Sequence, residues 1–286
     1  MRIGSGVLLA GLFLGALARA EDPPSATAAD PAGASPLTAT VTLASQYIFR
    51  GLRQSWGGPT LQGAFEYNAP HAFFGVFGSN TSSNYFASAI MELDAYGGLR
   101  ITPAEDFRID VGGIAYTYPG ATYAKFSPAG SLPDVSYNTA EANLAVTWMG
   151  ISFRASYALT PFFGFTDQTA PVGAFPGDHG AGVTAAGSQA TRGALYLEAA
   201  VTWEIVETWI GNAHLGRQGI AHSTGLSYED ASLGLTKNWP RGWSTSVFVT
   251  ATRDAAAYHD LPAASGDGST QSVGRTTGVL SLSRTF

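Results

Sequence analysis

The chain has 286 residues, a formal net charge of −6 and only 13% charged residues, against about 25% in an ordinary soluble protein. With 45% hydrophobic residues and 12% aromatic residues it is too apolar to be disordered and too poor in charge for a typical soluble surface. Lysine and arginine form no runs, which argues against a nucleic-acid partner. The absence of cysteine excludes disulfides, thiol catalysis and iron–sulfur sites.

The first residues predict an export signal. Arg2 is followed by the apolar run GVLLAGLFLGALA and then by Ala18-Arg19-Ala20, a small-x-small cleavage pattern. The run is shorter than the roughly 20 residues that span a membrane. We therefore expect a signal peptide over 1–20, cleaved after Ala20; the alternative is a single uncleaved anchor. Residues 21–38, rich in Pro, Ala, Ser and Asp, predict a disordered periplasmic leader.

From residue 39 to residue 286 the dominant hydrophobic period is two, which is typical of strands. In the segment 151–159, for example, Ile151, Phe153 and Tyr157 share one face, and Ser152 and Arg154 share the other. The same alternation predicts about twelve strands, over 40–50, 60–68, 72–80, 89–101, 107–118, 138–148, 151–159, 194–203, 208–218, 227–237, 243–252 and 275–286.

The predicted connections alternate between short and long, which distinguishes two all-β architectures. Tight turns are expected at 69–71, 102–106, 149–150, 204–207 and 238–242, and the long connections between them include 119–137, 160–193 and 253–274. A soluble β-sandwich gives no reason for this alternation. Short periplasmic turns and long extracellular loops are typical of a transmembrane antiparallel up-and-down β-barrel, which is the predicted fold over 39–286.

Aromatic residues gather beside the short turns: Tyr67, Phe73, Phe107, Trp148, Trp203, Trp209 and Trp243. Tyr47, Phe49 and Tyr157 are expected at the opposite strand ends. Aromatic rings are most stable at membrane interfaces, so this placement supports an outer-membrane location.

The C-terminal segment GVLSLSRTF is expected to close the barrel by pairing with the first strand, because an open edge leaves backbone groups unpaired in lipid. Leu280, Leu282 and Phe286 would face the lipid. The terminal phenylalanine also resembles the C-terminal signal that barrel-assembly machinery recognises, which makes that machinery an expected partner.

The polar parity of the strands predicts the lining of the interior: Gln62, Glu66, Asn80, Glu92, Asp94, Arg108, Asp110, Glu141, Arg154, Glu198, His214 and Asp230. The opposite, lipid-facing parity is nearly free of charge in the middle of the strands. Carboxylates exceed cations in the inward set, which suggests a narrow pore with a mild cation preference. In the alternative, these charges pair with Arg50, Arg100, Arg108 and Arg154 and fill the lumen. Across the two interpretations, three states of the lumen are expected: open, crossed by ion pairs, or plugged by the 160–193 loop.

His214 is a histidine on an inward strand position, and it is a candidate functional residue. Counted from the turns, it falls opposite Asp230, and Glu198 falls beside Asn212 or His214. Such a histidine could gate the pore at about pH 6–7 or form a structural ion pair in the wall. No serine is expected beside it, so a Ser–His–acid hydrolase is not predicted. The histidines at 71, 179, 214, 222 and 259 show no metal-ligand spacing, and no metal or other cofactor is expected.

Several stretches together resemble the TorF family, a proteobacterial outer-membrane barrel family formerly of unknown function. They include SQYIFRGLRQS (45–55), LQGAFEY (61–67), ELDAYGG (92–98), DVGGIAYTYPG (110–120), YNTAEANL (137–144), AHLGRQ (213–218), YEDASLGLT (228–236) and SLSRTF (281–286). The resemblance implies an outer-membrane β-barrel and a channel, and it supplies no functional residues.

Three functions remain open at this point. The first is a porin-like channel for passive diffusion of small polar solutes or ions, in contact with outer-membrane lipid and lipopolysaccharide. The second is a structural or plugged barrel with no open pore. The third is an outer-membrane hydrolase, since a fold does not determine a function.

Overall fold

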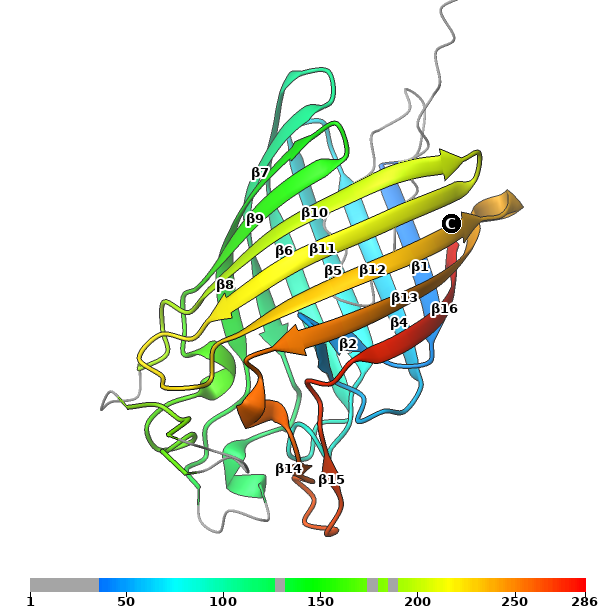
Figure 1. The fold of residues 1–286 in the computed structure, drawn as a ribbon. Coiled ribbons are helices and arrows are strands. Elements are labelled where there is room, and N and C mark those ends of the chain that lie inside the picture. Colours follow the sequence, from blue (N-terminus) through cyan, green and yellow to red (C-terminus); the bar gives the residue numbers. More distant parts are fainter. Residues whose placement is uncertain (1–35, 127–131, 174–179, 185–189) are drawn as a thin grey trace, which may run out of the picture.

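The computed structural model describes residues 36–126, 132–173, 180–184 and 190–286. The predicted signal peptide and nearly all of the predicted leader lie outside these residues. Twelve antiparallel strands form a closed barrel in which neighbours along the chain are also neighbours in the sheet (Figure 1). They are β1 (Leu37–Ala44), β4 (Thr60–Asn68), β5 (Ala72–Asn80), β6 (Met91–Ala104), β7 (Phe107–Thr117), β8 (Thr139–Trp148), β9 (Ile151–Ala158), β10 (Leu195–Val206), β11 (Trp209–Gly219), β12 (Tyr228–Asn238), β13 (Trp243–Arg253) and β16 (Thr277–Thr285). The predicted up-and-down barrel of twelve strands is confirmed.

The short and long connections lie at opposite ends of the barrel, as predicted (Figure 1). The short turns span 69–71, 105–106, 149–150, 207–208 and 239–242. Strands β6 and β10 run three residues further than the sequence pattern indicated, so their turns are tighter than predicted. Met149 and Gly150 both have positive φ, +48° and +82°, as the two-residue turn that suits the twist of a hairpin requires.

The last strand closes the barrel against the first. Thr40 pairs with Thr285 and Leu43 with Leu282. The backbone N–H of Phe286 donates to the carbonyl of Ala39 at 2.9 Å, which continues this pairing to the terminal residue. Closure removes the two free edges that a twelve-stranded sheet would otherwise carry.

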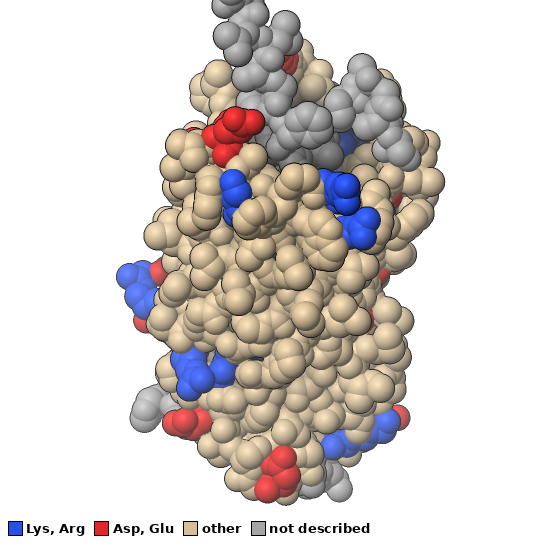
Figure 2. Space-filling view, turned by 90° about the vertical axis from the view of Figure 1, so that its right-hand side faces the viewer, with Lys and Arg blue, Asp and Glu red and all other residues tan. Residues whose placement is uncertain are grey.

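The strand alternation separates an apolar outer surface from a polar interior. On β16, Leu280 and Leu282 are 58% and 44% exposed, whereas Ser281 and Ser283 between and beside them are buried. Figure 2 shows one side of the barrel, where a broad middle band carries few charged side chains. Trp148, Trp203, Trp209, Trp243 and Phe286 are all exposed beside the short turns, which confirms that much of the predicted aromatic ring faces outward.

The predicted first strand over 40–50 is wrong at its end. Strand β1 stops at Ala44, and the chain then turns into a small hairpin of β2 (Ile48–Phe49) and β3 (Leu52–Arg53). Tyr47 and Phe49 were expected at the outer interface, but they are 1% and 4% exposed. Their rings pack against Phe77 and Tyr116, on inward positions of β5 and β7, so apolar burial inside the barrel outweighs extension of β1.

The long connections pack together over the loop end of the barrel. They contain the short helices η1 (Tyr123–Lys125), η3 (Phe162–Gly164) and η5 (Ala256–Tyr258) and a hairpin of β14 (Leu261–Pro262) and β15 (Thr270–Gln271), while η4 (Pro240–Gly242) lies in a short turn. Phe86, Tyr118 and Phe163 belong to one apolar cluster in which the rings of Phe86 and Tyr118 are 4.0 Å apart. The expected plug over 160–193 lies partly outside the described residues. In the described part of the chain, no helix is long and apolar enough to cross a membrane.

Candidate pore interior

All ten charged residues expected to line the pore lie on inward strand positions. Eight of them are buried: Glu66, Glu92, Asp94, Asp110, Glu141, Glu198, His214 and Asp230. Arg108 and Arg154 are partly exposed. Asn80 was also expected to face inward, but it is exposed at the end of β5, where its amide holds the backbone of Leu61 and Pro59.

The β2–β3 hairpin is built around a turn of only two residues. Ile48 pairs with Arg53 and Phe49 with Leu52, which leaves Arg50 and Gly51 as the turn. Both have positive φ, +46° and +77°, the geometry of a mirror-image hairpin turn. A β-carbon on Gly51 would lie 2.6 Å from Cβ of Asp230, so only glycine lets the hairpin tip approach the wall this closely.

Arg50 fastens the hairpin tip to the barrel wall. Its two terminal nitrogens donate to both carboxylate oxygens of Glu141, at 2.9 and 2.7 Å, and one of them also donates to Gln218 at 2.8 Å. The guanidinium lies over the ring of Tyr196, 4.3 Å from its centroid. Arg50 and Glu141 are 2% and 1% exposed, so this is a buried, two-pronged ion pair.

The hairpin brings in a second cation, Arg53. Its guanidinium donates to the carbonyl of Ser272 at 2.9 Å, in the connection between β13 and β16. Burial, aided by the nearby charge of Arg275, lowers the pKa of Arg53 to about 10. At neutral pH Arg53 therefore remains charged, and the hairpin carries two buried positive charges, Arg50 against the barrel wall and Arg53 against the loops.

Toward the short turns, the interior charges also form ion pairs. Asp110 accepts a hydrogen bond from Nε of Arg100 at 2.9 Å, and its other oxygen forms an ion pair with Nε of Arg108 at 3.0 Å. Phe73, expected in the outward aromatic ring, instead lies beneath the guanidinium of Arg100 at 5.2 Å, on the inward side. Of the four arginines that the alternative interpretation paired with wall carboxylates, Arg50, Arg100 and Arg108 form such pairs.

The register of β10 differs from the one counted along the sequence. Glu198 lies opposite Arg154 on β9 and Gly216 on β11, rather than beside Asn212 or His214. The counting error arises because β10 runs on to Val206 and contains an irregularity between Glu204 and Val206. One extra residue in a strand changes every pairing beyond it.

His214 contacts an acid and a hydroxyl at once. Its strand partner is Ser232, and Asp230 lies two residues along on the same face. Nε2 lies 2.5 Å from Oδ1 of Asp230, and Nδ1 lies 2.8 Å from Oγ of Ser232. Tyr196 also donates to Asp230, at 3.2 Å. The contact with Asp230 was predicted; the expectation that no serine lies beside His214 was wrong, because the counted register was displaced by two.

Near the closure of the barrel, the interior wall carries mainly small hydroxyl side chains. The hydroxyl oxygens of Thr42 on β1 and Ser283 on β16 are hydrogen-bonded at 2.8 Å. Those of Thr60 on β4 and Ser79 on β5 are hydrogen-bonded at the same distance. The charged residues lie mainly on β6 to β12. The sequence pattern contains this asymmetry, as the polar positions of β1 and β16 are all Thr or Ser, but only the barrel order places these strands side by side.

Among the residues that the structure describes, no group of three or more His, Cys, Asp or Glu side chains is arranged to hold a metal ion.

A family model described as "Bacterial protein of unknown function (Gcw_chp)" matches residues 28–286. No curated protein matches the chain in sequence. Among solved structures, the KdgM porin is 8% identical with a TM-score of 0.49, covering 87% of this chain and 98% of that chain. The NanC porin is 7% identical with a TM-score of 0.44, over 87% and 98% of the two chains. OprD of Pseudomonas aeruginosa is 11% identical with a TM-score of 0.37, over 88% and 66%.

Proposed function

We propose a function for this chain, which belongs to the bacterial Gcw_chp family of proteins of unknown function. The chain acts as a porin-like channel of the outer membrane, through which small polar solutes or ions diffuse passively. The resemblance to the TorF family points to the same function. The short turns would face the periplasm and the long loops the outside.

The observation that carries this proposal is a closed barrel whose outer surface is apolar and whose interior holds charged groups on inward positions. In a water-soluble protein the apolar side chains would form the core, and the charges would lie outside. The inverted arrangement suits a wall between lipid and an aqueous passage.

The β2–β3 hairpin would narrow this passage at the loop end. It crosses into the interior and is held by Arg50 at β8, β10 and β11. A channel narrowed this way passes small solutes, and movement of the hairpin would widen it.

The interior charge favours a mild cation preference. The described carboxylates outnumber the guanidiniums: Glu66, Glu92, Asp94, Asp110, Glu141, Glu198 and Asp230 face Arg50, Arg53, Arg100, Arg108 and Arg154. Carboxylates lining a narrow pore attract cations. Ion pairing with arginine reduces this surplus, so the preference would be small.

The proposal is tested with mature protein refolded into a planar bilayer under a salt gradient, once heat-modifiable gel migration has shown that the barrel is folded. Discrete current steps with a reversal potential on the cation side are expected. Steps with an anion-side potential would keep the channel and contradict the charge argument. A folded barrel without current would contradict the channel.

A structural, plugged barrel is the second candidate, and burial of the interior favours it. Glu92 and Glu141 are each 1% exposed, and the loops pack into an apolar cluster at the mouth. The same bilayer experiment separates the two functions, because the plugged barrel would fold and pass no current even after the Arg50–Glu141 pair is removed.

The contacts of His214 with Ser232 and Asp230 resemble a Ser–His–acid set, so the hydrolase function is considered again. Acyl transfer needs backbone donors for the developing oxyanion. Ser232 lies inside β12, whose backbone is paired with β11 on one side and β13 on the other. Its local N–H groups are therefore engaged in the sheet, and we interpret the three residues as a structural element of the wall. Hydrolysis of a lipid ester that is lost on Ser232→Ala would contradict this interpretation.

A further inference from the structure

The outer surface of the barrel carries one row of charges that the lipid-facing parity did not predict. Arg217, Glu229 and Arg253 are strand partners on β11, β12 and β13, near the loop end. Their side chains point outward, and the two arginines are 68% and 74% exposed. Charged side chains on a lipid-facing surface are costly, so this row calls for a physical reason.

Glu229 holds both arginines in place. One carboxylate oxygen accepts from Arg217 at 2.9 Å, and the other accepts from Arg253. Each guanidinium has five N–H donors, and Glu229 accepts from one nitrogen of each, so most donors remain for another acceptor. Asp254 lies 3.6 Å from Nε of Arg253 and is itself 73% exposed, so the two guanidiniums are matched by two carboxylates and the row is formally neutral. The two guanidiniums therefore lie on either side of the Glu229 carboxylate, which fixes their positions in the row.

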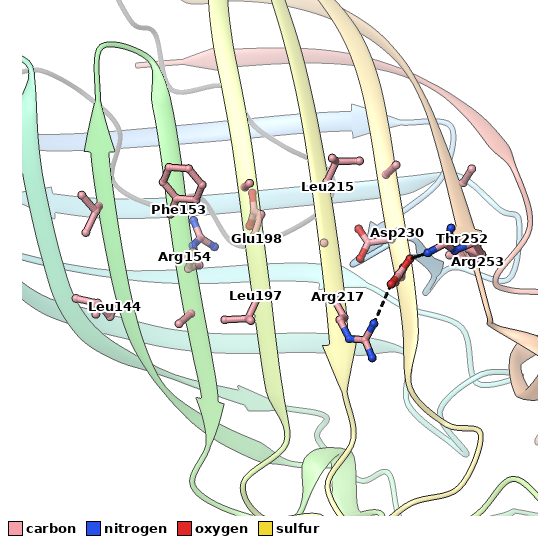
Figure 3. Close-up of a pocket in the computed structure, with 17 residues that line it drawn as sticks. Leu144, Phe153, Arg154, Leu197, Glu198, Leu215, Arg217, Asp230, Thr252 and Arg253 are labelled. Atoms are coloured by element: carbon pink, nitrogen blue, oxygen red, sulfur yellow. Dashed lines mark hydrogen bonds and ion pairs between the residues drawn. The ribbon is translucent and has the colours of Figure 1, made fainter.

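An apolar hollow of about 770 Å³ adjoins this row on the outer surface (Figure 3). The next row toward the short turns pairs Phe153, Ala199, Leu215, Ala231 and Ala251 across β9 to β13. Small alanines make the floor, and Leu144, Phe153, Leu197 and Leu215 stand around it, with Leu215 67% exposed. The two rows lie two residues apart along the strands, or about 7 Å.

We propose that this surface binds a phosphorylated, acylated lipid of the leaflet that the loops face, of the lipid A class. The phosphate would accept hydrogen bonds from Arg217 and Arg253, and an acyl chain would lie in the alanine-floored hollow. Two oriented guanidiniums match a phosphate, which accepts several charge-assisted bonds at once. The apolar hollow beside them, on the side of the short turns, matches a chain joined to that phosphate. The inference rests on the proposed location in the outer membrane.

The test uses refolded mature protein in an uncharged detergent and diphosphorylated lipid A as the probe, with bound lipid counted by native mass spectrometry. Wild-type protein is expected to retain the lipid, and the double variant Arg217→Gln/Arg253→Gln to bind it at least about tenfold more weakly, the loss of two charge-assisted contacts. The variant Ala199→Leu, which fills the floor of the hollow, should also weaken binding. Arg192→Gln, which removes an exposed charge from a loop, is the matched control and should bind as wild type does.

Three results would overturn the inference. They are equal binding by the double arginine variant, equal binding of fully dephosphorylated lipid A, and displacement of the lipid by inorganic phosphate at the same concentration, which would show that the hollow contributes nothing.

The experiments distinguish failure of the channel proposal from failure of the lipid-site proposal. The double variant should conduct as wild type does, since both arginines lie outside the lumen. A folded barrel that binds lipid A through these arginines but carries no current would support the lipid site and contradict the channel. A barrel that conducts but still binds lipid A after both arginines are replaced would support the channel and contradict the lipid site.

Discussion

At the scale of single residues, the Arg50–Glu141 pair is the contact on which the interior depends most. Both side chains are almost fully buried, and the pair joins a loop to the wall. Breaking a buried pair by removing one partner leaves an uncompensated charge and costs about 3–5 kcal/mol. We therefore expect loss of Arg50 to release the hairpin from the barrel wall.

We predict that Arg50→Gln and Glu141→Gln both raise the single-channel conductance, because each releases the hairpin tip. Their reversal potentials should move in opposite directions: toward cation selectivity for Arg50→Gln, which removes a positive charge, and away from it for Glu141→Gln. Arg217→Gln, an equal charge change on the outer surface, should alter neither. If both interior variants shifted the reversal potential in the same direction, the charges of this pair would not face the ion path.

At the scale of elements, the β2–β3 hairpin fits the interior because of the close approach at Gly51. The backbone geometry there requires positive φ, and the wall at Asp230 and Thr252 leaves no room for a β-carbon. A side chain at position 51 would therefore carry two costs, one from the positive φ and one from the clash with the wall. A second glycine, Gly120, allows the first cost to be measured without the other. Gly120 has nearly the same φ, +78°, but a β-carbon there would meet no atom within 4 Å beyond its chain neighbours.

We predict that Gly51→Ala displaces the hairpin and that Gly120→Ala does not. Both variants bear the cost of a side chain at positive φ, about 1–2 kcal/mol. Gly51→Ala adds overpacking of about 1–3 kcal/mol. Higher conductance and faster proteolytic cleavage within 45–59 are expected for Gly51→Ala alone. Equal behaviour of the two variants would show that the hairpin does not depend on the close approach.

At the scale of the whole molecule, closure of the barrel joins the last strand, β16, to the first strand, β1, and Phe286 takes part in this pairing. Phe286 is paired through its backbone with Ala39 and is 65% exposed beside Trp243, with Arg284 lying over both rings. Its ring adds little to packing within the barrel, so we propose that its role is recognition by the assembly machinery.

We predict that Phe286→Ser reduces the amount of folded barrel in the outer membrane of expressing cells while leaving refolding in detergent nearly unchanged. Phe74→Ser removes another outward phenylalanine, 57% exposed, and should have a much smaller effect in cells. Folded protein is measured in both cases by heat-modifiable gel migration. Equal losses for the two variants in cells would indicate a general need for outward aromatics and no terminal signal.

The sequence alone determined the barrel, its number of strands, the ends at which short and long connections lie, and which charged residues point inward. These features depend on a period of two and on connection length, and both are local properties of the chain. Only the tertiary structure decided that the β2–β3 hairpin packs inside the barrel, that His214 contacts Ser232 as well as Asp230, and that Arg217, Glu229 and Arg253 form one row beside a hollow. Each of these depends on strand register or on contacts between residues far apart in the chain. Register shifts with a single irregularity such as the one in β10, and the burial that holds the hairpin comes from β5, β7, β8 and β10, which follow it in the sequence.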